Sequence, residues 1–149
     1  MNPLHAIASG AAGAVTLTLA HQAASATLED APRVDIVAER ALAAGYRAAG
    51  QVPPPRAQLH RMALAGDLVS NSLYYSLVGV GDPRHALRRG AILGFLGGLG
   101  AALLPPVLGL GKNPVQRTPQ TIAMTVAWYT LGGLAAATTQ MVLSGGSDD

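Results

Sequence analysis

The charged residues of this chain are unevenly distributed, and four long stretches contain almost none of them. Residues 3–27, 90–111 and 118–147 contain no Asp, Glu, Lys or Arg, and residues 62–81 contain a single one, Asp67. A helix needs about 20 apolar residues to cross the ~30 Å hydrocarbon core of a bilayer. The pattern therefore predicts an all-α integral membrane bundle of four transmembrane helices, with the whole chain forming one domain.

Composition supports a membrane protein. Half of the 149 residues are hydrophobic and only 12% are charged, whereas a soluble domain carries roughly a quarter charged residues. A soluble Ala/Gly-rich bundle is the alternative, but it would need polar helix faces that these stretches lack. The chain contains no cysteine, which excludes disulfides and thiolate metal sites. Its net charge of +2 does not indicate a nucleic-acid partner.

Local signals set the expected helix boundaries. The four transmembrane helices are predicted at about residues 4–24, 58–80, 89–110 and 119–143. Pro105 and Pro106 predict a break in the third of them, because proline disfavours helical geometry in the residue before it. An amphipathic surface helix is predicted at about residues 31–49. Its apolar face is mostly alanine, so we expect it to dock on protein rather than insert into lipid.

The first apolar segment also resembles a secretory signal. Residues 6–22 and the following Ala24-Ser25-Ala26 are typical of a signal core and its cleavage site. No Lys or Arg precedes them, however, and Thr16, Thr18 and His21 interrupt the apolar run. Cleavage would leave three transmembrane helices instead of four.

The distribution of Lys and Arg predicts the orientation. The first and third loops together contain Arg33, Arg40, Arg47, Arg56, Arg61, Lys112 and Arg117, the second loop contains Arg84, Arg88 and Arg89, and the tails contain none. The positive-inside rule then places the first and third loops in the cytoplasm and both termini outside. The high density of arginine in the short second loop favours the opposite orientation.

A stripe of polar side chains follows one side of the second transmembrane helix. At 100° per residue, His60, Asp67, Asn71 and Tyr74 lie within about 60° of each other. An ionisable group in a membrane-length segment is costly, so it faces a partner, a cavity or a pathway. The stripe as a whole favours a structural role, in hydrogen bonding between helices. Asp67 equally suggests a polar path or binding pocket in which it carries a proton.

Glycines predict a close helix contact. Gly90, Gly94 and Gly98 form a doubled GxxxG pattern, which lets two helix backbones approach each other. The pattern does not separate contact within the chain from assembly into a homo-oligomer or a larger membrane complex.

The histidines pair by membrane side. His21 ends the first helix and His60 begins the second, so both lie at the same face of the membrane. A haem with two axial histidines, or a two-histidine metal site, would need such a pair. Solvated interfacial histidines are the simpler interpretation, so we expect no metal and no cofactor. No HExxH, Walker, GxSxG or dinucleotide motif is present, so the sequence predicts neither catalytic residues nor an enzyme.

Several segments resemble those of known membrane proteins. The segments are AAGAVTLTLAHQ at residues 11–22, APRVD at 31–35, GDLVSNSLYYSLVG at 66–79 and RTPQTIAMTVAWYTLGGLAAA at 117–137. They resemble small bacterial integral membrane proteins of unknown activity, and the overall layout is similar to that of YagU-like inner membrane proteins. The resemblance implies a four-helix bundle in the bacterial plasma membrane and implies no particular activity.

The sequence thus predicts a multi-pass plasma-membrane protein whose partners are the lipid bilayer and other membrane helices. The function it favours is a non-enzymatic structural or interaction subunit with tightly packed Gly/Ala-rich helices. A proton-linked carrier or small channel that uses the stripe around Asp67 is the first alternative. A redox subunit that binds quinone or haem through His21 and His60 is the second.

Overall fold

The structure is a computed structural model, and it describes residues 2–111 and 114–145. Within these residues the chain forms five α-helices, two short 3₁₀ turns and no strand. The α-helices are α1 (Pro3–Thr27), α2 (Val34–Ala48), α3 (Arg56–Ser76), α4 (Ala86–Val107) and α5 (Pro119–Gly145), and the turns η1 (Leu77–Gly79) and η2 (Pro83–His85) lie between α3 and α4. An all-α fold is confirmed.

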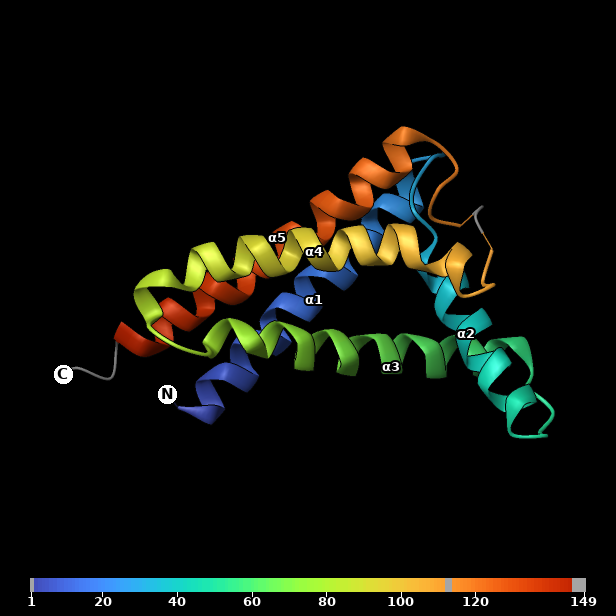
Figure 1. Cartoon of the computed structure of the whole chain (residues 1–149), viewed down its shortest axis with the longest axis horizontal. Helices are drawn as coiled ribbons and strands as arrows, with labels where there is room; N and C mark the ends of the chain where they lie inside the picture. The colour runs from blue at the N-terminus through green and yellow to red at the C-terminus, as the bar shows by residue number, and fades with distance from the viewer. Residues whose placement is uncertain (1, 112–113, 146–149) are drawn as a thin grey trace.

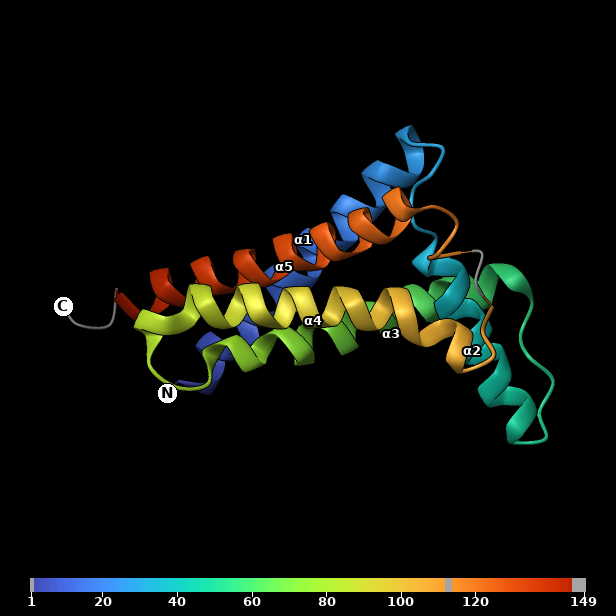
Figure 2. The same cartoon turned by 45° about the horizontal axis from the view of Figure 1, so that its top comes forward.

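Four of the helices form a bundle and the fifth caps one end of it. α5 packs against α4 on one side and α1 on the other, and α1 also packs against α3. α2 packs against α3 near the beginning of that helix (Figure 1). Both termini and the α3–α4 turn lie at the end of the bundle opposite α2 (Figures 1 and 2). α1 and α5 spread away from α3 and α4 toward the α2 end in both views.

Glycines form the seam between α4 and α5. Gly90, Gly94 and Gly98 are all buried on α4, and the carbonyl oxygen of Gly133 lies directly against Gly90. A Cβ atom added to Gly94 would lie 2.5 Å from the Cα of Thr130, closer than any real side chain allows. Glycine is required here because the two backbones touch. The GxxxG pattern is therefore used for a contact within one chain.

Buried hydrogen bonds connect the helices that meet at α5. The Ser9 hydroxyl of α1 donates to Oε1 of Gln140 at 2.9 Å. The hydroxyl of Tyr75 on α3, fully buried, donates to the backbone carbonyl of Tyr129 at 2.7 Å. In apolar surroundings such bonds fix the register of neighbouring helices, since the alternative is an unpaired polar group.

α4 continues through its two prolines, where a break was expected. It runs to Val107 with Pro105 and Pro106 inside the helix. Proline lacks an N–H, so Pro106 leaves the carbonyl of Ala102 without its helical donor. The side-chain amide of Gln116 donates to that carbonyl at 2.9 Å. This substitute bond satisfies the freed acceptor, and the helix remains intact.

Two segments, rather than the four expected, are long and apolar enough to cross a membrane. Among the described residues these are Pro3–Thr27 and Pro83–Val107. Only 33% and 28% of the residues in their most apolar 18-residue stretches are buried. α3 falls short because it carries Arg56, Arg61 and Asp67, and α5 because threonine, glycine and glutamine lower its hydropathy. By length and composition, two of the four expected helices could therefore cross a membrane.

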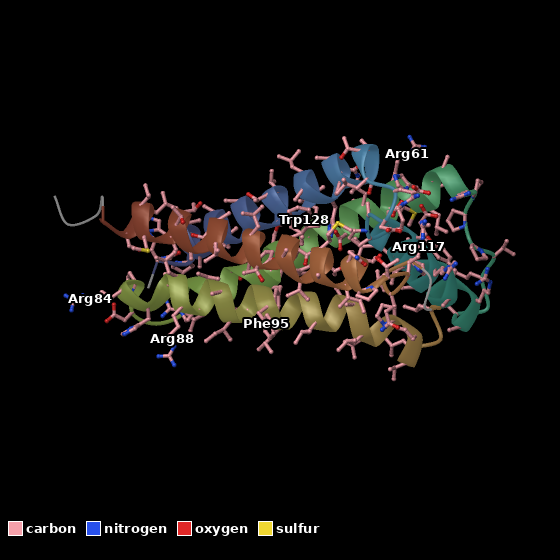
Figure 3. The ribbon with its side chains drawn as sticks, turned by 90° about the horizontal axis from the view of Figure 1, so that it is seen from above. Arg61, Arg84, Arg88, Phe95, Arg117 and Trp128 are labelled. Atoms are coloured by element: carbon pink, nitrogen blue, oxygen red, sulfur yellow. The ribbon has the colours of Figure 1, made fainter. Side chains whose placement is uncertain are left out.

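Charged side chains lie toward the two ends of the bundle, and apolar side chains lie between them. Figure 3 shows Arg84 and Arg88 at one end and Arg61 and Arg117 near the other, with Phe95 and Trp128 between them. Large apolar side chains along the middle are exposed, among them Ile92, Phe95, Leu96, Leu73 and Leu131. An apolar surface of this kind is unusual for a soluble monomer and marks a surface that is covered by lipid or protein.

Candidate functional site

The side chains of the polar stripe on α3 form hydrogen bonds with different parts of the molecule. The side-chain amide of Asn71 donates to Oδ1 of Asp67 at 3.0 Å, one helical turn away. The Tyr74 hydroxyl donates to the backbone carbonyl of Leu93 on α4 at 2.8 Å. His60, at the beginning of the stripe, contacts α2 instead. Asp67, Asn71 and Tyr74 therefore form the part of the stripe that lies inside the bundle.

A groove of about 510 Å³ lies between α3 and α4 and ends under α2. Its polar lining consists of Asp67, Asn71 and Tyr74 from α3 and Tyr129 from α5. The remaining wall is mainly apolar and comes from α2, α4 and the segment after it: Val34, Val37, Ala38, Leu96, Ala101, Leu104, Leu108 and Leu110. The volume falls in the ~300–1,000 Å³ range of small-molecule pockets. The groove suits a ligand with an apolar body and one polar group.

A second, much smaller cavity of about 40 Å³ lies on the other side of Asp67. It is enclosed by α1, α2 and α3, and its polar lining includes His21, Asp35, His60 and Asp67. Asp67 thus lines both cavities. The Asp67 carboxyl therefore borders both the water-sized cavity and the ligand-sized groove.

Asp67 lacks a cationic partner in the part of the chain that the structure describes. The ion pairs found there all involve other acids, and Asn71 is the side chain that bonds to the Asp67 carboxyl. Removing a carboxylate from water without a compensating cation is costly. A proton or a cationic ligand would remove that cost, so the carboxyl can exchange one for the other.

His21 and His60 line the same small cavity. The His21 ring is buried and makes an edge contact with Tyr129 at a centroid distance of 6.0 Å. Its Nε2 atom has no hydrogen-bond partner among the described residues. A cavity of about 40 Å³ is far smaller than the pockets that hold organic cofactors. The histidine pair therefore favours water or a metal ion over a haem.

An ion-pair cluster docks α2 on α3, and the sequence did not indicate it. The polar face of an amphipathic surface helix normally lies in solvent, yet Glu39 on α2 is buried. The Nδ1 atom of His60 lies 2.7 Å from Oε1 of Glu39, and the Nε atom of Arg56 lies 3.6 Å from Oε2. The available signal in the sequence was a pair of acids one turn apart, Asp35 and Glu39, followed by His60 near the start of the next helix. That signal does not specify which helices meet.

Asp35 belongs to the same cluster. The Nε and Nη2 atoms of Arg33 donate to its two oxygens at 3.0 and 2.7 Å. Burial disfavours the charged form of this carboxyl, but the bonds and charge of Arg33 outweigh burial and hold the pKa of Asp35 below its ordinary value. Asp35 is therefore an anion at neutral pH at the edge of the small cavity.

No protein-family model, curated protein or solved structure matches the chain. The resemblance to YagU-like proteins stays a prediction.

Proposed function

We propose that this protein is a multi-pass protein of the bacterial plasma membrane that binds a small amphipathic cation in the groove between α3 and α4. The Asp67 carboxyl anchors the charge of the ligand and exchanges a proton for it, which makes the protein a proton-linked carrier. The observation that carries the proposal is the position of Asp67, which lines both cavities and lacks a cationic partner among the described residues.

Four membrane crossings are part of the proposal. α3 has 21 residues and α5 has 27, which correspond to about 32 and 40 Å at 1.5 Å per residue. Both lengths suffice for a ~30 Å hydrocarbon core. α5 carries no charged residue and packs between the two helices whose hydropathy already suits a membrane. Arg56 and Arg61 lie in the first turns of α3, where long side chains can reach the membrane surface, and Asp67, deeper in the helix, lines the groove and the small cavity.

The groove chemistry supports a cationic ligand with an apolar body. Its single acid supplies the negative charge, and Asn71 and Tyr74 supply further polar contacts. The leucines along the wall, including Leu96 and Leu104, are exposed and would contact an apolar ligand. The structural role predicted from the glycines has less support, because Gly90, Gly94 and Gly98 are used inside the chain.

Equilibrium binding of tetraphenylphosphonium to the purified protein in lipid nanodiscs tests the proposal. We expect saturable binding that Asp67→Asn weakens tenfold or more, since opposite charges about 5 Å apart attract by roughly 3 kcal/mol at an effective dielectric constant of about 20 and 1.4 kcal/mol is a factor of ten. Asp82→Asn is the matched control. It removes an exposed acid at the other end of the bundle, and asparagine retains the side-chain oxygen that accepts from the backbone N–H of Arg84.

Proton exchange is measured in the same samples. In weakly buffered solution, binding should release about one proton per bound cation from the wild-type protein and none from Asp67→Asn. Undiminished affinity of Asp67→Asn would refute the anchoring role. Binding without proton release would refute the exchange and leave a cation-binding protein.

A further inference from the structure

Three side chains from two helices bring potential metal ligands together at the α2 end of the bundle. Asp35 and Glu39 are one turn apart on α2, and His60 lies in the first turns of α3. One ligand atom from each, a carboxylate oxygen or an imidazole nitrogen, lies within 4.8 Å of the other two. This cluster is separate from the ligand groove, which none of these three residues lines.

The distances suit a transition-metal ion after the ligand side chains adjust. Zinc binds histidine nitrogen and carboxylate oxygen at about 2.0–2.2 Å. In a tetrahedral site two such ligand atoms are about 3.4 Å apart, so a pair as far apart as 4.8 Å needs to approach by about 1.4 Å, while closer pairs separate. The His60 Nδ1 and Glu39 Oε1 atoms are already 2.7 Å apart. A metal ion would take the place of the hydrogen atom that joins them.

A buried histidine next to the cluster gives independent evidence for a ligand. His21 is only 8% exposed and lines the small cavity together with Asp35 and His60. Its Nε2 atom is buried without a partner among the described residues. A water molecule needs about 10–15 Å³, so the cavity of about 40 Å³ holds roughly two or three. A water bound to a metal ion at the cluster would supply the missing hydrogen bond.

The cationic residues around the cluster are arranged so that they do not block an ion. Arg33 holds Asp35 through both carboxylate oxygens, as outer-shell partners of metal ligands do. Arg56 is a weaker competitor, because its side chain is 80% exposed and its contact with Glu39 is 3.6 Å long. Both acids retain lone pairs that a metal ion can use.

We propose that Asp35, Glu39 and His60 bind a divalent transition-metal ion such as Zn²⁺, and that His21 forms a hydrogen bond with a water molecule on that ion. The site joins α2 to α3 and closes the end of the bundle at which the groove terminates. One histidine and two carboxylates with an open position for water suit Zn²⁺ and also Co²⁺, which can report the ligand geometry.

Isothermal titration calorimetry with Zn²⁺ on the full-length protein in detergent tests the proposal. We expect one saturable site, with affinity lost more than about 100-fold in His60→Gln. Removal of an outer-shell group costs 10–100-fold, so His21→Leu should lower the affinity by that smaller factor and keep the stoichiometry. His85→Gln is the control, because His85 is exposed at the opposite end of the bundle.

A second variant separates loss of ligands from loss of folding. Asp35→His supplies a nitrogen ligand in place of a carboxylate, so it should retain Co²⁺ binding with a shifted visible absorption spectrum, whereas Asp35→Leu should lose binding. Circular dichroism establishes that each variant keeps its helices. Two results would overturn the proposal: wild-type protein that shows no saturable site, or His60→Gln with unchanged affinity. Either result would leave the cluster as an ion-pair network that docks α2.

Discussion

Two adjacent tyrosines on α3 connect that helix to two different neighbours. Consecutive residues on a helix point about 100° apart. The Tyr74 hydroxyl therefore reaches the carbonyl of Leu93 on α4, and the Tyr75 hydroxyl reaches the carbonyl of Tyr129 on α5. Tyr74 lies along the groove, whereas Tyr75 is fully buried in the core. Their roles in binding and in stability can thus be tested separately.

Tyr75→Phe removes one buried hydrogen bond and leaves the ring in place. The carbonyl of Tyr129 already accepts a helical bond, so we expect a loss of about 1 kcal/mol in the free energy of unfolding. Denaturation in mixed detergent micelles measures the change. Tyr46→Phe is the control, since the Tyr46 hydroxyl has no hydrogen bond within the described parts of the chain. Equal stability of both variants would contradict a stabilising role for the Tyr75 bond.

At the scale of elements, each contact depends on which residues face the neighbouring helix. The α4–α5 seam depends on glycines at a spacing of four, whereas an exposed glycine has no such role. Gly66 of α3 is exposed, and a Cβ atom there would meet nothing within 4 Å. The same substitution at Gly94 and at Gly66 therefore separates helix contact from helix propensity.

Gly94→Ala should destabilise the bundle by several kcal/mol, because overpacking pushes the backbones of α4 and α5 apart. Gly66→Ala should be neutral or stabilise by up to about 1 kcal/mol, since alanine favours helix. Thermal unfolding followed by circular dichroism compares the two. A Gly94→Ala protein as stable as Gly66→Ala would show that α4 and α5 do not touch at this position.

The sequence predicted the helices better than the contacts between them. Periodicity and turn residues located the surface helix at 31–49, and the structure has it at Val34–Ala48. The break expected at Pro105 and Pro106 was wrong: α4 runs through both prolines, and a distant side chain, Gln116, donates to the Ala102 carbonyl that Pro106 leaves free. The burial of Glu39 against His60 was missed for the same reason. Both depend on pairing between segments, about which the local pattern of one helix carries no information.

The candidate site was predictable only in part. Helical spacing brought Asp67, Asn71 and Tyr74 to one side of α3, and all three line the groove. His60 has the same spacing but lies where α2 covers the helix, so it joins the ion-pair cluster instead. The groove itself depends on how α3 and α4 are placed and on α2 lying across their end. Those placements follow from tertiary packing and leave no local signal.

At the scale of the whole molecule, the two ends of the bundle differ in chemistry. The α2 end carries the ion-pair cluster and the two longer connections, while the opposite end holds both termini and the short α3–α4 turn. With four crossings, all residues of one end lie on the same side of the membrane. Because Lys and Arg are in excess in the connections at the α2 end, we expect that end to lie in the cytoplasm under the proposed four crossings.

The absence of cysteine in the chain makes this orientation directly testable. We introduce Gln51→Cys, in the exposed connection before α3, and Ser144→Cys, near the end of α5. In intact bacterial cells a membrane-impermeant maleimide should label residue 144 and should reach residue 51 only after lysis. The reverse labelling would invert the orientation, and labelling of both sites from one side would contradict the three crossings, α3, α4 and α5, that separate them.

The leucines that border the groove have a consequence for how a ligand arrives. Leu96, Leu104 and Leu108 are more than half exposed and line the groove, so under four crossings its opening faces the acyl chains. A ligand then partitions into the bilayer before it binds, and its mole fraction in lipid sets the occupancy of the site. At a fixed total amount of a strongly partitioning ligand, doubling the lipid halves the mole fraction of ligand in the bilayer. The apparent dissociation constant, expressed as the total ligand concentration of the sample, therefore doubles.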